Sequence, residues 1–400
     1  MERAGMNRRH KLPLRGDYLP LVIVITFLGT ACFAGLRPVV PLYAAAHACS
    51  YSQIGIIGAV TALLFTATSL PFGRLSDKVG RKGVLLVGTG GLATTSILFL
   101  LAYDFMTIFA AAAVLGLFLG AWFPVIGAVA AEAPTASDGR GRAMGFYSAA
   151  ISAAYTAAPF LACVLLDYFD FKAAFVFCGA LGFSAAALTF FTRVGTPAAA
   201  RGVEGAERNG YAADPPQETH AYESRNVIYA SAAFVYGFFV SVLFVFFPVI
   251  AKRFVSETGI GLSLATFSLV RTFTFAGAGS IMERYEKKLL ITTGITGCSA
   301  LMASLAVTNN LYQFLAILAA MGLAIGIVYP SAITLAASTV RKGSALGIYE
   351  TAIGMGTLLG PLLSGFAAEL NPVYPYLLCS ILGVAAVMLL LKVKFESGEG

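Results

Sequence analysis

The stretch Gly73-Arg-Leu-Ser-Asp-Lys-Val-Gly-Arg-Lys82 lies between two long apolar runs, residues 53–72 and 84–103. It combines several cations with a single carboxylate, Asp77, and a glycine stands on either side of that acid. Cations alone are the ordinary mark of a loop on the cytoplasmic side of a membrane. That mark does not explain the spaced acid and glycines, so we expect this loop between two membrane spans to have a role of its own.

The whole chain has the composition of a membrane protein. Of its 400 residues, 58% are hydrophobic and 12% are charged, and the mean hydropathy is +0.81. Soluble domains have about 25% charged residues. The net charge of +7 does not indicate nucleic-acid binding, because the basic residues are dispersed between apolar segments. The six cysteines have no paired spacing, so neither a disulfide framework nor a metal site is predicted.

Apolar runs of about 20 residues, the length that crosses a bilayer, recur along the chain. Helices are the expected spanning form, because lipid offers backbone groups no hydrogen-bond partner and the runs lack the alternation of β-barrel strands. The first run has no cleavage site after it and is expected to be a retained helix. The predicted spans cover residues 18–43, 53–72, 84–103, 107–130, 144–166, 172–192, 226–250, 259–281, 289–307, 311–334, 345–369 and 374–391.

Lysines and arginines are distributed unevenly among the connections. Most of the 27 fall in the first segment, in the last segment and in every second connection between spans. This asymmetry predicts that both termini are cytoplasmic, which requires an even number of spans. The longest polar segment, residues 193–225, is expected to be a flexible linker. It separates an N-terminal six-helix bundle, residues 1–192, from a C-terminal six-helix bundle, residues 226–400.

The two halves repeat one another. GLFLGAWFP at Gly116–Pro124 matches GLAIGIVYP at Gly322–Pro330, 206 residues further on. GRAMGFYSAAIS, which begins at Gly141, matches GSALGIYETAIG, which begins at Gly343, 202 residues further on. Matching segments in the same order indicate parallel repeats related by an axis along the membrane normal. The predicted fold is therefore an all-α membrane protein with twelve transmembrane helices in two six-helix halves related by pseudo-two-fold symmetry.

The GRLSDKVGRK stretch resembles the signature of the major facilitator superfamily, G-x-L-a-D-[RK]-x-G-R-[RK], in its usual place between helices 2 and 3. With the repeat, the resemblance covers the whole chain and implies a secondary transporter of the bacterial drug or small-molecule:proton antiporter type. Two features depart from that type. Ala158, Ala162 and Cys163 stand where helix 5 of such antiporters has glycines, and Ala112 and Gly116 show that helix 4 lacks their arginine. Their proton route is therefore not carried over.

The resemblance implies that the stretch braces the two halves on the cytoplasmic side. Asp77 is expected at the positive N-terminus of helix 11, near Gly343. Arg81 is expected to pair with Glu132, at the inner end of helix 4. A glycine and a proline in helix 11 allow bending, although plain helix packing explains them equally well. The predicted gating residues are Gly73, Asp77, Gly80, Arg81, Lys82, Glu132, Gly360 and Pro361.

Three ionisable residues lie inside apolar segments, namely Arg37, Arg271 and Glu350. A charge at the bilayer centre costs at least about 2.5–3.5 kcal/mol, so it normally faces a cavity or a partner. A structural Arg–Glu ion pair is one interpretation. One glutamate cannot neutralise two arginines, however, so the remaining cation suggests a substrate with a carboxylate or another anionic group.

Glu350 has a second predicted role as the proton carrier. Aromatic residues on the same predicted helices are candidates for substrate contact, with packing as the alternative for each. The predicted substrate-binding residues are Arg37, Arg271, Glu350, Tyr147, Tyr349, Trp122 and Tyr329.

The sequence predicts a secondary active transporter that moves a small organic molecule by alternating access, with proton-coupled export as the first interpretation. The alternatives are proton-coupled uptake of an organic anion, a membrane enzyme, and a non-transporting receptor. An enzyme requires a convergent nucleophile or metal cluster, and a receptor would be expected to have a large soluble domain. No cofactor is predicted, and the chain has no ATP-binding loop of the G-x-x-x-x-G-K-[ST] kind. The expected partners are a substrate, protons and the lipid bilayer, with the chain a monomer in a bacterial inner membrane.

Overall fold

A computed structural model describes residues 19–132, 139–192, 216–339 and 342–393. Within those ranges, twelve helices are long and apolar enough to cross a membrane, as predicted. They are α1 (Leu19–Ala46), α2 (Tyr51–Val79), α3 (Arg81–Leu101), α4 (Phe105–Glu132), α5 (Gly139–Tyr168), α6 (Phe171–Phe191), α7 (Pro216–Ala251), α8 (Glu257–Met282), α9 (Lys287–Leu305), α10 (Leu311–Ala337), α11 (Lys342–Leu370) and α12 (Tyr374–Lys392).

Two helix ends differ from the sequence prediction. Residues 73–79, which were predicted to form a loop, are helical and form the end of α2, whose last residue is Val79. The chain turns at Gly80, whose φ of 100° is a left-handed value that favours glycine. In the second half, α7 begins at Pro216, before the predicted start at residue 226. Proline is favourable at the first position of a helix, so α7 extends beyond its apolar segment.

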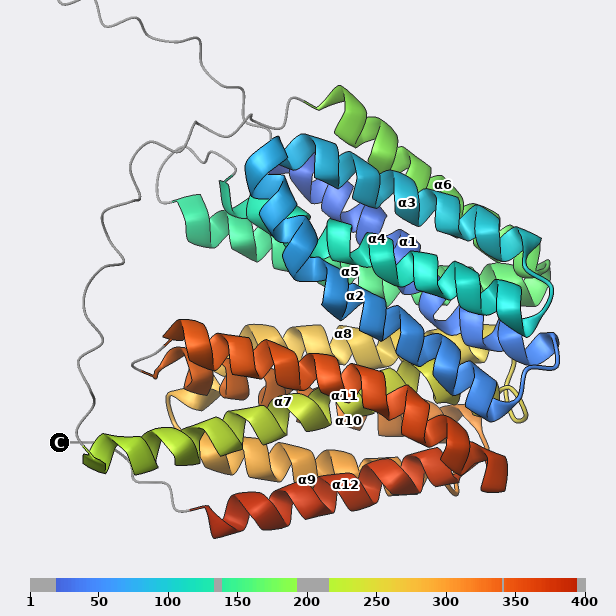
Figure 1. The fold of residues 1–400 in the computed structure, drawn as a ribbon. Coiled ribbons are helices and arrows are strands. Elements are labelled where there is room, and N and C mark those ends of the chain that lie inside the picture. Colours follow the sequence, from blue (N-terminus) through green and yellow to red (C-terminus); the bar gives the residue numbers. More distant parts are fainter. Residues whose placement is uncertain (1–18, 133–138, 193–215, 340–341, 394–400) are drawn as a thin grey trace, which may run out of the picture.

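The helices form two bundles, α1–α6 and α7–α12, which lie one above the other in Figure 1. In the first bundle α1 packs against α5, and α2 against α4. The same relations recur in the second bundle, where α7 packs against α11, and α8 against α10. The predicted repeat is therefore present in the packing as well as in the sequence.

The two bundles contact each other at one end and in the middle, and they diverge toward the other end. We call the end at which α1 begins and α12 ends the basic end, and the opposite one the far end. The bundles meet mainly where α2 packs on α11 and α5 on α8. Near the far end, a Cβ added to Gly55 of α2 would lie 2.4 Å from the Pro361 carbonyl oxygen of α11. Toward the basic end the bundles diverge, and a Cβ added to Gly73 or Gly347 would meet no described atom within 4 Å.

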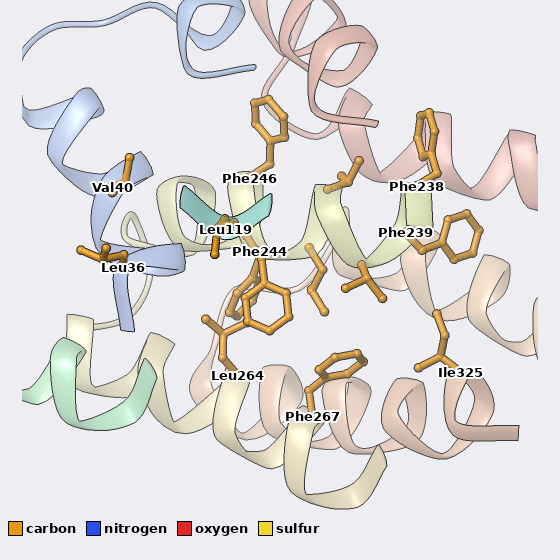
Figure 2. Close-up of a cluster of buried hydrophobic side chains, with 14 of the residues drawn as sticks. Leu36, Val40, Leu119, Phe238, Phe239, Phe244, Phe246, Leu264, Phe267 and Ile325 are labelled. Carbon is orange, nitrogen blue, oxygen red and sulfur yellow. The ribbon is translucent and has the colours of Figure 1, made fainter. Parts of the chain in front are cut away.

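An apolar layer joins the bundles between these ends (Figure 2). Leu36 of α1 belongs to the same buried cluster as Phe244 of α7 and Phe267 of α8. Figure 2 shows the Phe244 ring beside Leu264 and above Phe267. These rings are fully buried, so the molecule is packed in its middle and open only toward the basic end.

Candidate functional site

The GRLSDKVGRK stretch holds α2, α3 and α4 together at the basic end. The Arg81 guanidinium donates from Nε to Glu132 Oε2 at 2.7 Å and from Nη2 to Glu132 Oε1 at 2.6 Å. Its Nη2 also lies 3.3 Å from Asp77 Oδ1. This two-pronged contact confirms the predicted Arg81–Glu132 pair, and a planar fork of donors suits a carboxylate.

Asp77 is not at the N-terminus of α11 in this conformation. Its side chain is 65% exposed, and its recorded ion pair is the one with Arg81. The basic ends of α2 and α11 are apart, so the predicted contact requires the basic end to close. Lys82 binds the first bundle at another place, since its Nζ donates to the Phe190 carbonyl oxygen at 2.7 Å. That oxygen belongs to the last turn of α6, where carbonyl groups attract cations.

Gly360 and Pro361 lie where α11 passes closest to its neighbours. A Cβ added to Gly360 would lie 2.4 Å from Ser241 Oγ and 3.0 Å from the Phe238 carbonyl oxygen, both in α7. The carbonyl of Pro361 faces Gly55 across the contact between the bundles. Close packing therefore explains both residues in this conformation, and their bending role stays a prediction.

The two arginines of the apolar segments both lie close to one aromatic ring, that of Tyr155. The Arg37 guanidinium carbon is 6.0 Å from the centre of the Tyr155 ring, and that of Arg271 is 5.8 Å from it. Tyr155 comes from α5, Arg37 from α1 and Arg271 from α8. The site therefore draws on both bundles, and the two positive charges are close enough to repel each other.

Other aromatic rings surround the two guanidinium groups. Arg37 lies 3.9 Å from the centre of the Phe244 ring. Arg271 lies 5.3 Å from Phe267 and 5.7 Å from Phe275. Each cation–π contact contributes about 0.5–2 kcal/mol, so the contacts around one arginine together offset a large part of the cost of at least about 2.5–3.5 kcal/mol for a charge at mid-membrane. The rings supply no full negative charge, however, so they leave each cation without a countercharge.

No carboxylate compensates the arginines within the described residues. The three ion pairs recorded there join Arg81 to Asp77 and Glu132, and Lys252 to Glu257. Arg271 is only 9% exposed, and its Nε has no hydrogen-bond partner. The Arg–Glu350 ion pair considered from the sequence is thus not formed in this conformation.

Glu350 lies nearer the basic end, beside a group of tyrosines. Glu350 follows the buried Tyr349 in α11, and the Tyr349 hydroxyl donates to the Tyr329 carbonyl oxygen. The Tyr329 ring is 5.0 Å from Tyr236 and 5.9 Å from Tyr349. Because Phe275 is 5.5 Å from Tyr329, this group adjoins the rings around Arg271. Glu350 itself is exposed and has no recorded ion-pair partner among the described residues.

The remaining predicted substrate contacts are placed differently. Trp122 is fully buried, and a Cβ added to Gly29 of α1 would lie 2.4 Å from its ring. It also packs on Gly88 of α3, so in this conformation it fills the core of the first bundle. Tyr349 is buried, and its hydroxyl donates to the Tyr329 carbonyl oxygen at 3.4 Å. Tyr147 is half-buried, and its hydroxyl oxygen lies 3.2 Å from the position of a Cβ added to Gly127 of α4.

The sequence does not single out the rings that contact the arginines. Tyr155 is one of several aromatic residues that the sequence offers as substrate contacts, and Phe244 is one of 31 phenylalanines and belongs to no motif. The charged residues were recognisable because charge is rare inside apolar segments. Their aromatic partners become evident only when α1, α5, α7 and α8 are brought together.

Comparison with known proteins places this architecture in a family. The model of the Major Facilitator Superfamily matches residues 22–254 and 229–399. An uncharacterised MFS-type transporter of Methanocaldococcus jannaschii is 25% identical over 376 residues, which are 87% of this chain and 91% of that one. The multidrug resistance protein MdtG of Serratia proteamaculans is 36% identical over 122 residues, 29% of either chain.

Solved structures agree on the fold. The crystal structure of a nucleoside transporter, NupG, superposes with a TM-score of 0.80 at 12% identity. The alignment covers 94% of this chain and 100% of that one. At such low identity the likeness concerns the arrangement of helices and not the substrate.

Proposed function

Because the chain belongs to the Major Facilitator Superfamily, and is thus a multi-pass membrane transporter and not an enzyme, we propose that it exports a small organic molecule in exchange for protons. Partial likeness to the multidrug resistance protein MdtG supports export. We take the substrate to bind between the bundles, where Arg37, Arg271 and the surrounding rings meet. This site would be accessible from one side of the membrane at a time, alternating between the two sides.

The observation that carries proton coupling is the position of Glu350. It lies about 12 Å along the helix axis from the first residue of α11, and no cation neutralises it in the described structure. The proton affinity of a carboxyl group depends on its burial and its neighbours. Closure of the basic end would bury Glu350 among Tyr329 and Tyr349 and so change that affinity. A group that changes in this way can load a proton on one side and release it on the other.

We take the basic end to be cytoplasmic, because its connections carry most of the lysines and arginines. On this assignment the structure faces the cytoplasm, and both termini are cytoplasmic. Residues 1–192 and 226–400 are the two moving halves, joined by the linker 193–225. The chain acts as a monomer in a bacterial inner membrane, since the proposed site lies within one chain.

Substrate-dependent proton movement in proteoliposomes tests this function. The purified chain is reconstituted with a pH-sensitive dye inside, and small acids, zwitterions and cationic drugs are added one at a time. Export by antiport predicts that substrate entering the vesicle drives protons out. Protons that enter together with an added acid would instead indicate uptake of an organic anion, the function that the two arginines favour. The absence of proton movement with every compound that the protein transports would refute proton coupling.

A further inference from the structure

We propose that the transported molecule carries a carboxylate, sulfonate or similar anionic group, and that Arg37 and Arg271 bind this group beside Tyr155. The proposal deepens the transport function and rests on it. It concerns the class of substrate and does not depend on the direction of transport or on the coupling ion.

The first step is the charge at the site. The guanidinium carbons of Arg37 and Arg271 lie 6.0 and 5.8 Å from the centre of the Tyr155 ring, so two like charges that repel each other share this place. No aspartate or glutamate forms an ion pair with either arginine among the described residues. An anionic ligand would relieve the repulsion and supply the missing countercharge, whereas a cationic ligand would add a third positive charge.

The second step is the unused hydrogen-bonding capacity. Arg271 is more than nine-tenths buried, and its Nε has no acceptor. A guanidinium group offers a planar fork that binds carboxylates through two parallel hydrogen bonds. The Phe244 ring covers one face of the Arg37 guanidinium, with its centre 3.9 Å from the guanidinium carbon. The N–H donors of Arg37 therefore remain available along the edge of the guanidinium plane. Both groups are therefore suited to carboxylates and other oxyanions that present two oxygens to the guanidinium edge.

The third step is the rest of the ligand. Phe267 and Phe275 adjoin Arg271, and Tyr329 continues the aromatic surface toward Glu350. Rings of this kind favour flat apolar groups by stacking and by edge contacts. The fitting substrate is therefore an amphipathic organic anion, with its charge at the arginines and an aromatic body extending toward the basic end.

Equilibrium dialysis of the purified full-length chain in detergent tests this proposal without any ion gradient. The probes are radiolabelled 2-naphthoate and 2-naphthalenesulfonate, compared with neutral 2-naphthamide and cationic 2-naphthylmethylammonium. We expect the two anions to bind more tightly than the amide, and the cation to bind most weakly. The proposal is overturned if the amide or the ammonium compound binds as tightly as the acids, or if neither acid binds.

Variants locate the binding. Arg271→Ala and Arg37→Ala should each weaken 2-naphthoate binding about 10- to 100-fold, as expected for the loss of hydrogen bonds to a charged group. Arg271→Lys should weaken it less, because the charge remains while the fork is lost. Arg284→Ala, which removes an exposed arginine just beyond α8, is the matched control and should leave binding unchanged. Equal affinity of all variants and the wild type would place the anion elsewhere, and it would leave the proton-flux test of transport unaffected.

A second inference comes from an independent set of contacts at the far end. We infer that Asp167 and Glu369 form a latch that holds the far end closed. The Ser52 N–H, at the start of α2, donates to Glu369 Oε1 of α11 at 2.8 Å. The Thr258 N–H, at the start of α8, donates to Asp167 Oδ2 of α5 at 3.2 Å. Each carboxylate thus binds the first turn of a helix in the opposite bundle, where the helix dipole favours an anion.

The two contacts are equivalent under the sequence repeat. Asp167 and Glu369 are 202 residues apart, and Ser52 and Thr258 are 206 apart, which are the separations of the matched segments. The same contact therefore occurs twice, once in each direction between the bundles. Opening of the far end must break both hydrogen bonds, because donor and acceptor belong to different halves.

A native cysteine reports on this latch. Cys163 is fully buried, and its Cβ lies 2.6 Å from the position of a Cβ added to Gly261 across the α5–α8 contact. With the other five cysteines replaced by alanine, its rate of reaction with a membrane-impermeant maleimide measures far-end opening in nanodiscs. Asp167→Asn and Glu369→Gln should each raise the rate about 5- to 10-fold, and the double variant should raise it further.

Asp170→Asn is the matched control for the latch. Asp170 also lies at the far end and accepts from a helix N-terminus, the Ala173 N–H at 2.8 Å, but within the same bundle. Its replacement should leave Cys163 labelling unchanged. The inference is overturned if the latch variants label at the wild-type rate, or if Asp170→Asn accelerates labelling as much as they do.

Discussion

Gly55→Ala is expected to open the far end and close the basic end. A Cβ at this position would lie 2.4 Å from the Pro361 carbonyl oxygen and 3.0 Å from the Gly365 Cα. Both are backbone atoms of α11, so no side-chain rotation relieves the clash. Overpacking of this kind costs about 1–3 kcal/mol. If the far-end-open conformation lacks this contact, the ratio of closed to open molecules falls by about 5- to 150-fold.

Distances between spin labels measure this shift. At the far end, labels at Tyr103 and Val307 report on loops of opposite bundles, and both residues are exposed. At the basic end, labels at Val79, the last residue of α2, and at Tyr285, which follows α8, report on the separation of the two bundles; both residues are exposed. In a cysteine-free background, Gly55→Ala should lengthen the far-end distance and shorten the basic-end distance.

Alanine substitutions at two further glycines serve as controls for Gly55→Ala. A Cβ at Gly90 of α3 would meet no described atom within 4 Å, so Gly90→Ala should leave both distances unchanged. Gly73 of α2 is equally open in this conformation, but it is expected to face a neighbouring helix when the basic end closes. Gly73→Ala should therefore act in the opposite direction from Gly55→Ala. Unchanged distance distributions in Gly55→Ala would refute the view that this contact determines which end is closed.

Two other substitutions test the motif and the core. Asp77→Asn should impair turnover in proteoliposomes while leaving the melting temperature unchanged, because Asp77 is exposed here and is expected to act when the basic end closes; normal turnover would exclude the predicted contact of Asp77 with the N-terminus of α11. Trp122→Ala should lower the free energy of unfolding by about 3–5 kcal/mol, because the ring is fully buried and packs on Gly29; a melting temperature equal to that of the wild type would show that Trp122 is not a core residue.

The fold could be predicted from the sequence because the bilayer imposes simple rules. Twelve apolar runs, their basic connections and the matching GLFLGAWFP and GLAIGIVYP segments together required two related six-helix halves. The extension of α2 through Asp77 was missed, because cations and an acid between apolar runs resemble a loop. A helix does not need to end where the membrane does, and only Gly80 turned the chain.

The candidate site was predictable only where charge marked it. Arg37, Arg271 and the Arg81–Glu132 pair follow from the rarity of charge in apolar segments and from the motif. Tyr155 is only one of several aromatic candidates in the sequence, and nothing there indicates that both arginines lie beside it. Trp122 was predicted to contact substrate, but it packs in the core in this conformation. Which end of the molecule is closed depends on contacts such as Gly55 on Pro361, whose partners are far apart in the sequence.

Glu350→Gln in proteoliposomes tests proton-coupled transport most directly. A compound that moves protons with the wild-type protein is followed in two assays, accumulation driven by a pH gradient and exchange without a gradient. Glutamine keeps the size and polarity of the side chain but cannot carry the proton. Glu283→Gln, which changes an exposed acid at the end of α8, is the control. We predict that Glu350→Gln abolishes accumulation and retains exchange, whereas accumulation at the wild-type level would contradict the assignment of Glu350 as the proton carrier.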